Sequence, residues 1–179
     1  MKVFFNAGSL LALLLGAAQA VDMANYKAGS NVEAGFATFV KEWYRTSEEK
    51  ASTTTYTDFW VPDTGSMILA GNKFVGYKDM LAIKQKLLPP NGNKAWWHLI
   101  KGSKISGETA TDKTYVADIV IQTTFTPGNC SQATGAATFT ILKDKAGVPT
   151  LKPHSKAVSL YNLKVSDVNS PTNVACTKS

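Results

Sequence analysis

The chain has 179 residues, of which 44% are hydrophobic, and its formal net charge is +6 at pH 7. This length and composition suit one globular domain with a sizeable core and exclude an intrinsically disordered chain. The lysines are scattered along the sequence, so they do not form the concentrated basic surface that nucleic-acid binding requires.

Residues 1–20 have the pattern of a secretory signal peptide. Lys2 gives a positive start, an apolar stretch rich in leucine follows, and the segment ends in Ala18-Gln19-Ala20. The apolar stretch is short for a membrane span, and a buried core helix is the alternative interpretation. We expect cleavage before Val21, a protein that is secreted or stays in the lumen of the secretory pathway, and no membrane attachment after cleavage.

The first half of the remaining chain predicts helices and one hairpin. Residues 21–33 lack a regular pattern and are expected to be a flexible mature N-terminus. Apolar residues at three- and four-residue spacing predict a helix over residues 34–47, and a second, shorter helix is expected over residues 54–60. Gly71-Asn72 predicts a tight hairpin turn between strands 66–70 and 73–75, and a third helix is expected over residues 77–88.

The second half changes to long strands, predicted over residues 95–105, 114–125, 136–142 and 151–165. Helices followed by antiparallel strands indicate an α+β domain, which we place at residues 34–165. A strongly curved sheet wrapped over about three helices would leave a cavity at its open end. Small apolar molecules commonly bind in such cavities.

Two cysteines suggest one disulfide in an oxidising compartment. A bond between Cys130 and Cys176 would tie a C-terminal tail, residues 166–179, to the middle of the domain. A reactive thiol is the alternative for either cysteine. Asn129-Cys130-Ser131 also fits the N-glycosylation pattern, so Asn129 is a candidate glycosylation site.

Three sequence motifs in this order resemble one known superfamily. They are Phe36-x-x-Phe39-Val40, Phe59-Trp60-x-Pro62-Asp63 and Phe74-Val75-Gly76-Tyr77-Lys78-Asp79-Met80-Leu81. Together they resemble the nuclear transport factor 2-like cone fold, the superfamily of SnoaL-like cyclases, ketosteroid isomerase and scytalone dehydratase, over about residues 34–165. The resemblance implies a cone-shaped antiparallel sheet over about three helices, and a homodimer formed through the sheet face.

Local detail is most similar to scytalone dehydratase. Trp97-His98-Leu99-Ile100-Lys101-Gly102 resembles the start of its first long strand, and His98 matches a catalytic histidine there. The family's second catalytic histidine falls at Asp118 by spacing, and its active tyrosines have no clear match. The general-base aspartate of ketosteroid isomerase would fall near Leu69 or Ala70, so that mechanism does not transfer.

His98 and Asp118 are therefore the candidate acid–base pair. An imidazole can accept or donate a proton near neutral pH, and a carboxylate in an apolar stretch needs a partner. Tyr56, as a hydrogen-bond donor to a carbonyl, and Asp58, as a second acid–base group, are further candidates. The alternative places Asp118 at the surface, His98 at a strand end and Tyr56 in the core.

The candidate ligand pocket consists of Trp97, Trp60 and Phe39. Trp96 and Trp97 are neighbours on one strand and point to opposite faces, so only one of them is expected to line a cavity. The sequence contains no phosphate-binding loop, nucleotide motif or metal-ligand cluster. We therefore expect neither a cofactor nor a metal.

Two functions follow from these residues and the resemblance. The first is a cofactor-free cyclase, isomerase or dehydratase that acts on an apolar, polyketide-like carbonyl compound, like the cyclases of secondary metabolism in this superfamily. The second is a non-catalytic secreted protein that binds a small apolar molecule or another protein, as an effector does. The fold alone does not decide between them.

Overall fold

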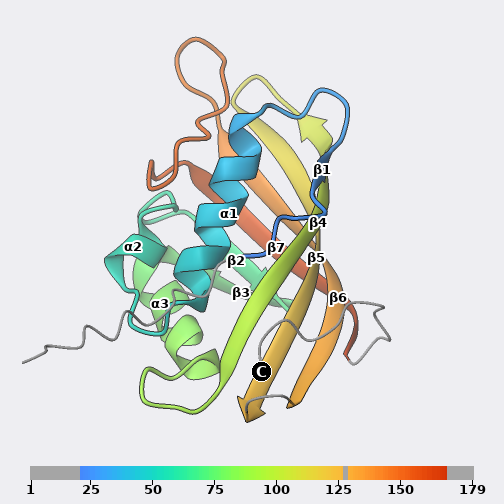
Figure 1. Cartoon of the computed structure of the whole chain (residues 1–179). Coiled ribbons are helices and arrows are strands. Elements are labelled where there is room, and N and C mark those ends of the chain that lie inside the picture. The colour runs from blue at the N-terminus through green and yellow to red at the C-terminus, as the bar shows by residue number, and fades with distance from the viewer. Residues whose placement is uncertain (1–20, 127–128, 169–179) are drawn as a thin grey trace, which may run out of the picture.

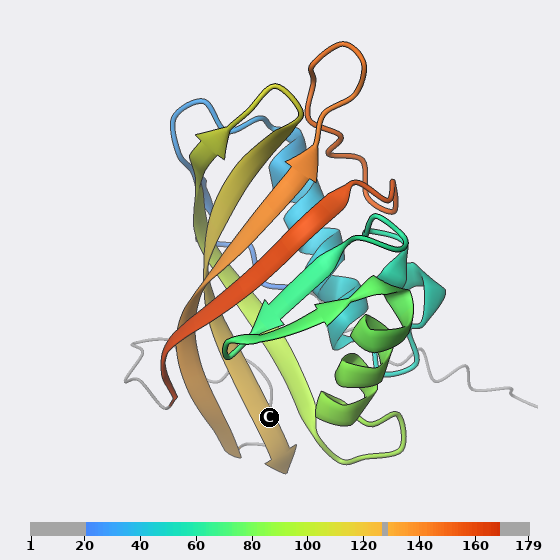
Figure 2. The same cartoon turned by 180° about the vertical axis from the view of Figure 1, so that it is seen from behind.

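The computed structural model describes residues 21–126 and 129–168. Within them, a seven-stranded curved sheet has the strand order β1-β4-β5-β6-β7-β2-β3. Helix α1 crosses its concave face, and α2 and α3 lie at one end beside the β2–β3 hairpin (Figure 1, Figure 2). No helix in these residues is long and apolar enough to cross a membrane. The α+β architecture predicted from sequence is confirmed.

The elements in chain order are β1 (Lys27–Ala28), α1 (Gly35–Glu48), α2 (Thr54–Thr57), β2 (Ser66–Leu69), β3 (Asn72–Val75), α3 (Gly76–Leu87), β4 (Ala95–Glu108), β5 (Asp112–Thr126), β6 (Asn129–Leu142) and β7 (Val158–Val168). Strand β7 begins seven positions later than expected from residue 151, since 158 − 151 = 7. His154 and Lys156 have φ angles of 60° and 58°, in the left-handed region. Such angles cannot continue a strand, so the segment before Val158 is a loop.

The N-terminal segment differs from the expected flexible end. Val21 is buried, Asp22 forms a parallel bridge with Leu99, and Lys27–Ala28 pairs with Gly102 and Ser103 of β4. The edge of β4 offers backbone N–H and C=O groups that need partners. Residues 21–28 supply them, although their sequence carries no strand periodicity.

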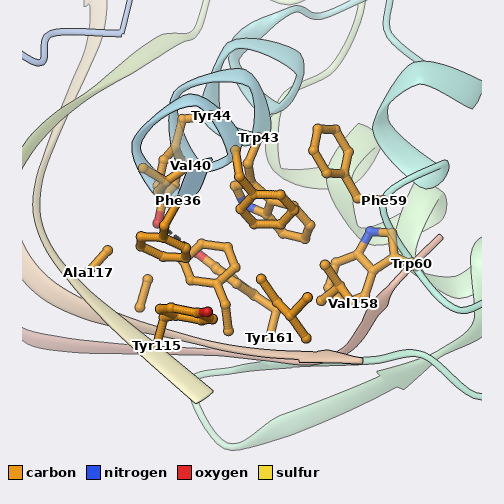
Figure 3. Close-up of a cluster of buried hydrophobic side chains, with 14 of the residues drawn as sticks. Phe36, Val40, Trp43, Tyr44, Phe59, Trp60, Tyr115, Ala117, Val158 and Tyr161 are labelled. Atoms are coloured by element: carbon orange, nitrogen blue, oxygen red, sulfur yellow. Dashed lines mark hydrogen bonds between the residues drawn. The ribbon is translucent and has the colours of Figure 1, made fainter. Parts of the chain in front are cut away.

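An aromatic cluster fills one end of the space between α1 and the sheet (Figure 3). The Trp43 ring lies at its centre, with ring centroids of four neighbours 4.8–5.2 Å away: Phe59, Trp60, Phe139 and Tyr161. Aromatic rings at these distances contribute dispersion and quadrupole interactions in addition to burial. This cluster fixes the position of α1 on the sheet.

The two faces of β4 and β5 have different roles. His98 and Ile100 of β4 face α1, whereas Trp97 and Leu99 form a separate buried cluster with Val120 on the other face. The faces alternate because successive side chains of a strand point in opposite directions. Along β5, and along β4 as far as Ile100, a residue's parity therefore decides whether it can reach the space beneath α1; the bulge between Ile100 and Gly102 shifts the alternation further along β4.

Replacing Trp43 with alanine should lower the free energy of unfolding by about 3–5 kcal/mol, because the cluster cannot collapse around so large a void. Urea denaturation followed by circular dichroism measures this change. Phe125 is 59% exposed, so Phe125→Ala is the matched control and should change the free energy by less than about 0.5 kcal/mol. Equal effects of the two substitutions would contradict the central role of Trp43.

Candidate active site

A mostly apolar cavity lies between α1, α3 and the inner face of the sheet. Its volume is about 140 Å³. The polar side chains in its wall are Tyr44, Ser47, Tyr56, Lys84, His98 and Tyr161. An apolar cavity with a few convergent polar groups has the general character of a small-molecule site.

His98 is anchored in the cavity wall by a carboxylate. Its Nδ1 lies 3.1 Å from Oε1 of Glu48, the last residue of α1, and its backbone N–H donates to the same oxygen at 2.7 Å. The two side chains are only 8% and 2% exposed. When Glu48 is ionised, this contact places the imidazole proton on Nδ1 and leaves Nε2 as the acceptor. Nε2 makes no hydrogen bond within the described part of the chain.

Three phenols accompany the imidazole. The Tyr44 ring stacks on the His98 ring with centroids 4.1 Å apart, and its hydroxyl lies 3.3 Å from that of Tyr161. Tyr56 donates to Met67 Sδ at 3.9 Å, a weak interaction. Burial raises the pKa of all three phenols above the ordinary value of 10.0. They therefore stay protonated near neutral pH, as donors.

Lys84 is held by hydrogen bonds to the backbone that follows α1. Its side chain is buried, and Nζ donates to the backbone carbonyls of Glu49 at 2.7 Å, Ser52 at 3.3 Å and Lys50 at 3.4 Å. Burial lowers the pKa of this ammonium, while the charge of Glu49 opposes that change. The three carbonyl contacts fix the chain directly after Glu48 and occupy the ammonium's donors.

Asp118 does not partner His98. The cross-strand neighbour of His98 is Ile121, three positions from Asp118, and an odd separation puts Asp118 on the opposite face of the sheet. Asp118 is exposed there, in a shallow depression that Lys101 and Lys164 also line. The expected His98–Asp118 pair is therefore wrong.

Glu48 is the carboxylate that the sequence analysis missed. A signal was present, because Glu48 follows Tyr44 by four residues and so continues the buried face of α1. A carboxylate on the buried face of an amphipathic helix needs a partner. Nothing in the sequence indicates which strand residue that partner is.

Only some of the other expected site residues line the cavity. Tyr56 lines the cavity as expected, whereas Asp58 follows α2, is half-buried and is not part of the cavity wall. Trp97 lies on the outer side of the sheet, where its Nε1 donates to Gln122 Oε1, and Trp96 lines the cavity in its place. The pocket assignment of Trp97 is thus corrected to its neighbour.

Trp60 and Phe39 do not line the cavity either. Both belong to the aromatic core, with 0% and 1% of their surface exposed. Phe39 lies on the buried stripe of α1, and the Trp60 ring packs 4.8 Å from Trp43. The pocket assignment of these two residues is therefore corrected to the core.

Several expectations fall outside the described structure. Residues 1–20 and Cys176 are not described, and the side chain of Asn129 is not described either. The signal peptide, the Cys130–Cys176 disulfide and the glycosylation of Asn129 stay predictions. Within residues 21–126 and 129–168, no group of three or more His, Cys, Asp or Glu side chains is arranged to hold a metal ion.

Comparisons with known proteins identify the architecture. No family model and no curated protein sequence matches the chain. The hexachlorocyclohexane dehydrochlorinase LinA-type3 of Novosphingobium barchaimii LL02 is similar in structure, with a TM-score of 0.55 at 12% identity over 79% of this chain and 93% of that one. A candidate scytalone dehydratase of Novosphingobium aromaticivorans DSM 12444 has a TM-score of 0.58 at 8% identity, over 79% and 89% of the chains.

Nuclear transport factor 2 of Cryptosporidium parvum is a third similar structure. Its TM-score is 0.54 at 10% identity, over 76% of this chain and 98% of that one. Identities this low establish the fold and nothing finer. The chain has the nuclear transport factor 2-like cone fold, as its motifs indicated, and this fold is shared by enzymes and a transport factor.

The three phenols of the cavity wall, Tyr44, Tyr56 and Tyr161, predict a specific alkaline behaviour. Because their pKa values are raised in the folded state, the unfolded chain loses its phenolic protons first, above about pH 10. Below that pH, the three phenols should cause no change in the free energy of unfolding with pH. Above it, each phenol should lower that free energy by about 1.4 kcal/mol per pH unit.

Urea denaturation between pH 8 and 11 measures this dependence, and Tyr56→Phe should remove one phenol's share of the slope. Absorbance at 295 nm supplies an independent check, because cavity tyrosines should ionise only as the chain unfolds. Ionisation of Tyr44, Tyr56 and Tyr161 in a chain with native circular dichroism would contradict the assignment.

Proposed function

We propose that the protein is a cofactor-free acid–base enzyme, a cyclase, isomerase or dehydratase, that acts on an apolar, polyketide-like carbonyl compound. One observation carries the proposal: the buried His98 imidazole lines an apolar cavity, with its Nδ1 held by Glu48 and its Nε2 without a hydrogen-bond partner in residues 21–126 and 129–168. Such an arrangement suits proton transfer to and from carbon.

The reaction begins with a carbonyl oxygen hydrogen-bonded to a cavity phenol, Tyr56 or Tyr44. Nε2 of His98 removes a proton from the adjacent carbon, and the electron pair of that C–H bond forms an enolate. Glu48 stabilises the imidazolium that results, as a carboxylate does behind a histidine general base.

The fate of the enolate decides the reaction type. Return of the proton to a different carbon completes an isomerisation. Donation of the proton to a departing hydroxyl releases water and completes a dehydration. Attack of the enolate on a second carbonyl forms a ring, and the proton then goes to the new alkoxide. All three use the same base and the same donors.

The similar structures support an elimination or proton-transfer chemistry at the level of the fold. One is described as a dehydrochlorinase and another as a candidate dehydratase. The similarity to a nuclear transport factor supports the alternative, a protein that binds without catalysis. The substrate class proposed here rests on the cavity residues of this chain and on the sequence resemblance.

We also propose that the protein travels through the secretory route and works outside the cell or in the pathway lumen. The support is the pattern of residues 1–20 together with the paired cysteines. Its partner in this proposal is a small apolar molecule, and two copies would associate through the sheet face.

The proposed reaction can be tested without knowledge of the natural substrate. 2-Tetralone is an apolar ketone with acidic α-hydrogens, and proton NMR in deuterium oxide follows their exchange. The protein should accelerate this exchange, and His98→Gln should lower the enzymatic rate by about 100-fold or more. The matched control is His154→Gln, because His154 lies outside the cavity and contacts Glu42.

Exchange no faster than in buffer, or exchange unchanged by His98→Gln, would contradict the proposal. Quenching of tryptophan fluorescence by 2-tetralone without exchange would favour the binding protein instead, since Trp43 and Trp96 line the cavity. A folding check by circular dichroism accompanies each variant.

A further inference from the structure

The Glu48 carboxylate is only half satisfied. Oε1 accepts the His98 backbone N–H and faces Nδ1, whereas Oε2 is buried and has no hydrogen-bond partner among the described residues. The side chain is 2% exposed, so water does not replace the missing partner at the surface. A buried carboxylate oxygen without a partner is costly, and a positive group beside it would remove that cost.

The backbone ladder on the edge of β4 identifies what lies there. Asp22 N–H donates to His98 C=O at 3.0 Å, and Ile100 N–H donates to Asp22 C=O at 2.9 Å. In a regular parallel ladder, the next N–H, that of His98, would donate to the carbonyl two residues before Asp22. It donates to Glu48 Oε1 instead. The carboxylate therefore occupies the ladder position that directly precedes Val21.

That position is next to the backbone nitrogen of Val21. In a regular ladder the carbonyl that precedes Val21 is bonded to this nitrogen, so we infer that a side-chain oxygen in the place of that carbonyl lies within about 4 Å of it, the range of an ion pair. The Val21 side chain is 4% exposed and belongs to the hydrophobic core. Together with the two Asp22 hydrogen bonds, this burial holds residue 21 against the edge of β4.

We propose that cleavage before Val21 completes the site, because it converts this nitrogen into an α-ammonium group that forms an ion pair with Glu48. In the uncleaved chain the same atom is a neutral peptide N–H. After cleavage it is an amine with an ordinary pKa near 7.7–8.0, charged at neutral pH. The inference rests on the processing site proposed above and deepens the role assigned to the His98–Glu48 pair.

The proposed ion pair would fix which nitrogen of His98 faces the cavity as an acceptor. The α-ammonium gives Glu48 Oε2 its missing partner, Oε1 stays directed at Nδ1, and Nε2 of His98 faces the cavity as the acceptor. Val21 thus acts as a positioning residue through its terminal amine. The His98–Glu48 pair would gain its missing positive partner only in the processed chain, after the chain has entered the secretory pathway.

The experiment compares two chains that differ by one residue, one beginning at Val21 and one beginning at Ala20. The Val21 chain should have a midpoint of thermal unfolding about 5–10 °C higher, because the longer chain lacks the buried ion pair. In the Glu48→Gln background the difference should fall below about 2 °C. Asp22→Ala is the control, because the Asp22 side chain accepts the Ala24 N–H and has no contact with Glu48 in the described structure; the difference should persist.

A second readout follows the amine itself. Cyanate carbamoylates a free neutral α-amine, so the buried, ion-paired amine of Val21 should react at least ten times more slowly than that of the Ala20 chain. Mass spectrometry of the N-terminal peptide measures both rates. This comparison needs no substitution and stays informative if Glu48→Gln fails to fold.

Three results would overturn the inference. The exported protein could begin at a residue other than Val21, the two chains could have equal midpoints and equal carbamoylation rates, or their difference could persist in Glu48→Gln. None of these readouts involves a substrate. A chain that shows the ion pair but fails the 2-tetralone test would refute the proposed reaction and leave this inference standing.

Discussion

The position of the Glu48 carboxylate against the edge of β4 is the constraint on which the site depends. It joins the last residue of α1 to the backbone and the ring of His98, 50 residues further along the chain. The helix end is an unfavourable place for a negative charge, because the unpaired carbonyls there carry a partial negative charge of their own. Compensation must come from elsewhere in the structure.

Lys84 provides part of that compensation. Its ammonium donates to three carbonyls just beyond the helix end, and so places a positive charge where the helix dipole is negative. The same lysine closes one side of the cavity. The His98–Glu48 pair and the cavity wall therefore both depend on polar contacts at the end of α1, next to the aromatic cluster around Trp43.

Sequence periodicity was sufficient to predict the helices and strands, but it was insufficient to predict which carboxylate contacts His98. The α1 stripe, the Gly71 turn and the long strands were predictable because each depends on residues close in sequence. The choice between Asp118 and Glu48 depends on the register of β4 against β5 and on where α1 ends on the sheet. Both are tertiary quantities, set by contacts with Ile121 and with the aromatic core. Edge residues 21–28 were missed because short edge strands carry no alternation.

The chemical character of the cavity limits which substrates it could serve. Its oxygen donors are phenols, kept protonated by burial, and its one imidazole is held by a carboxylate. Neutral donors stabilise an enolate through hydrogen bonds, and these bonds are stronger in an apolar surrounding than in water. The stabilisation is still smaller than that from a cationic group. Such a site suits carbon acids that are already acidified by an aryl or conjugated carbonyl. The proposed polyketide-like compounds have this property, and their apolar skeletons match the mostly apolar side chains of the cavity wall.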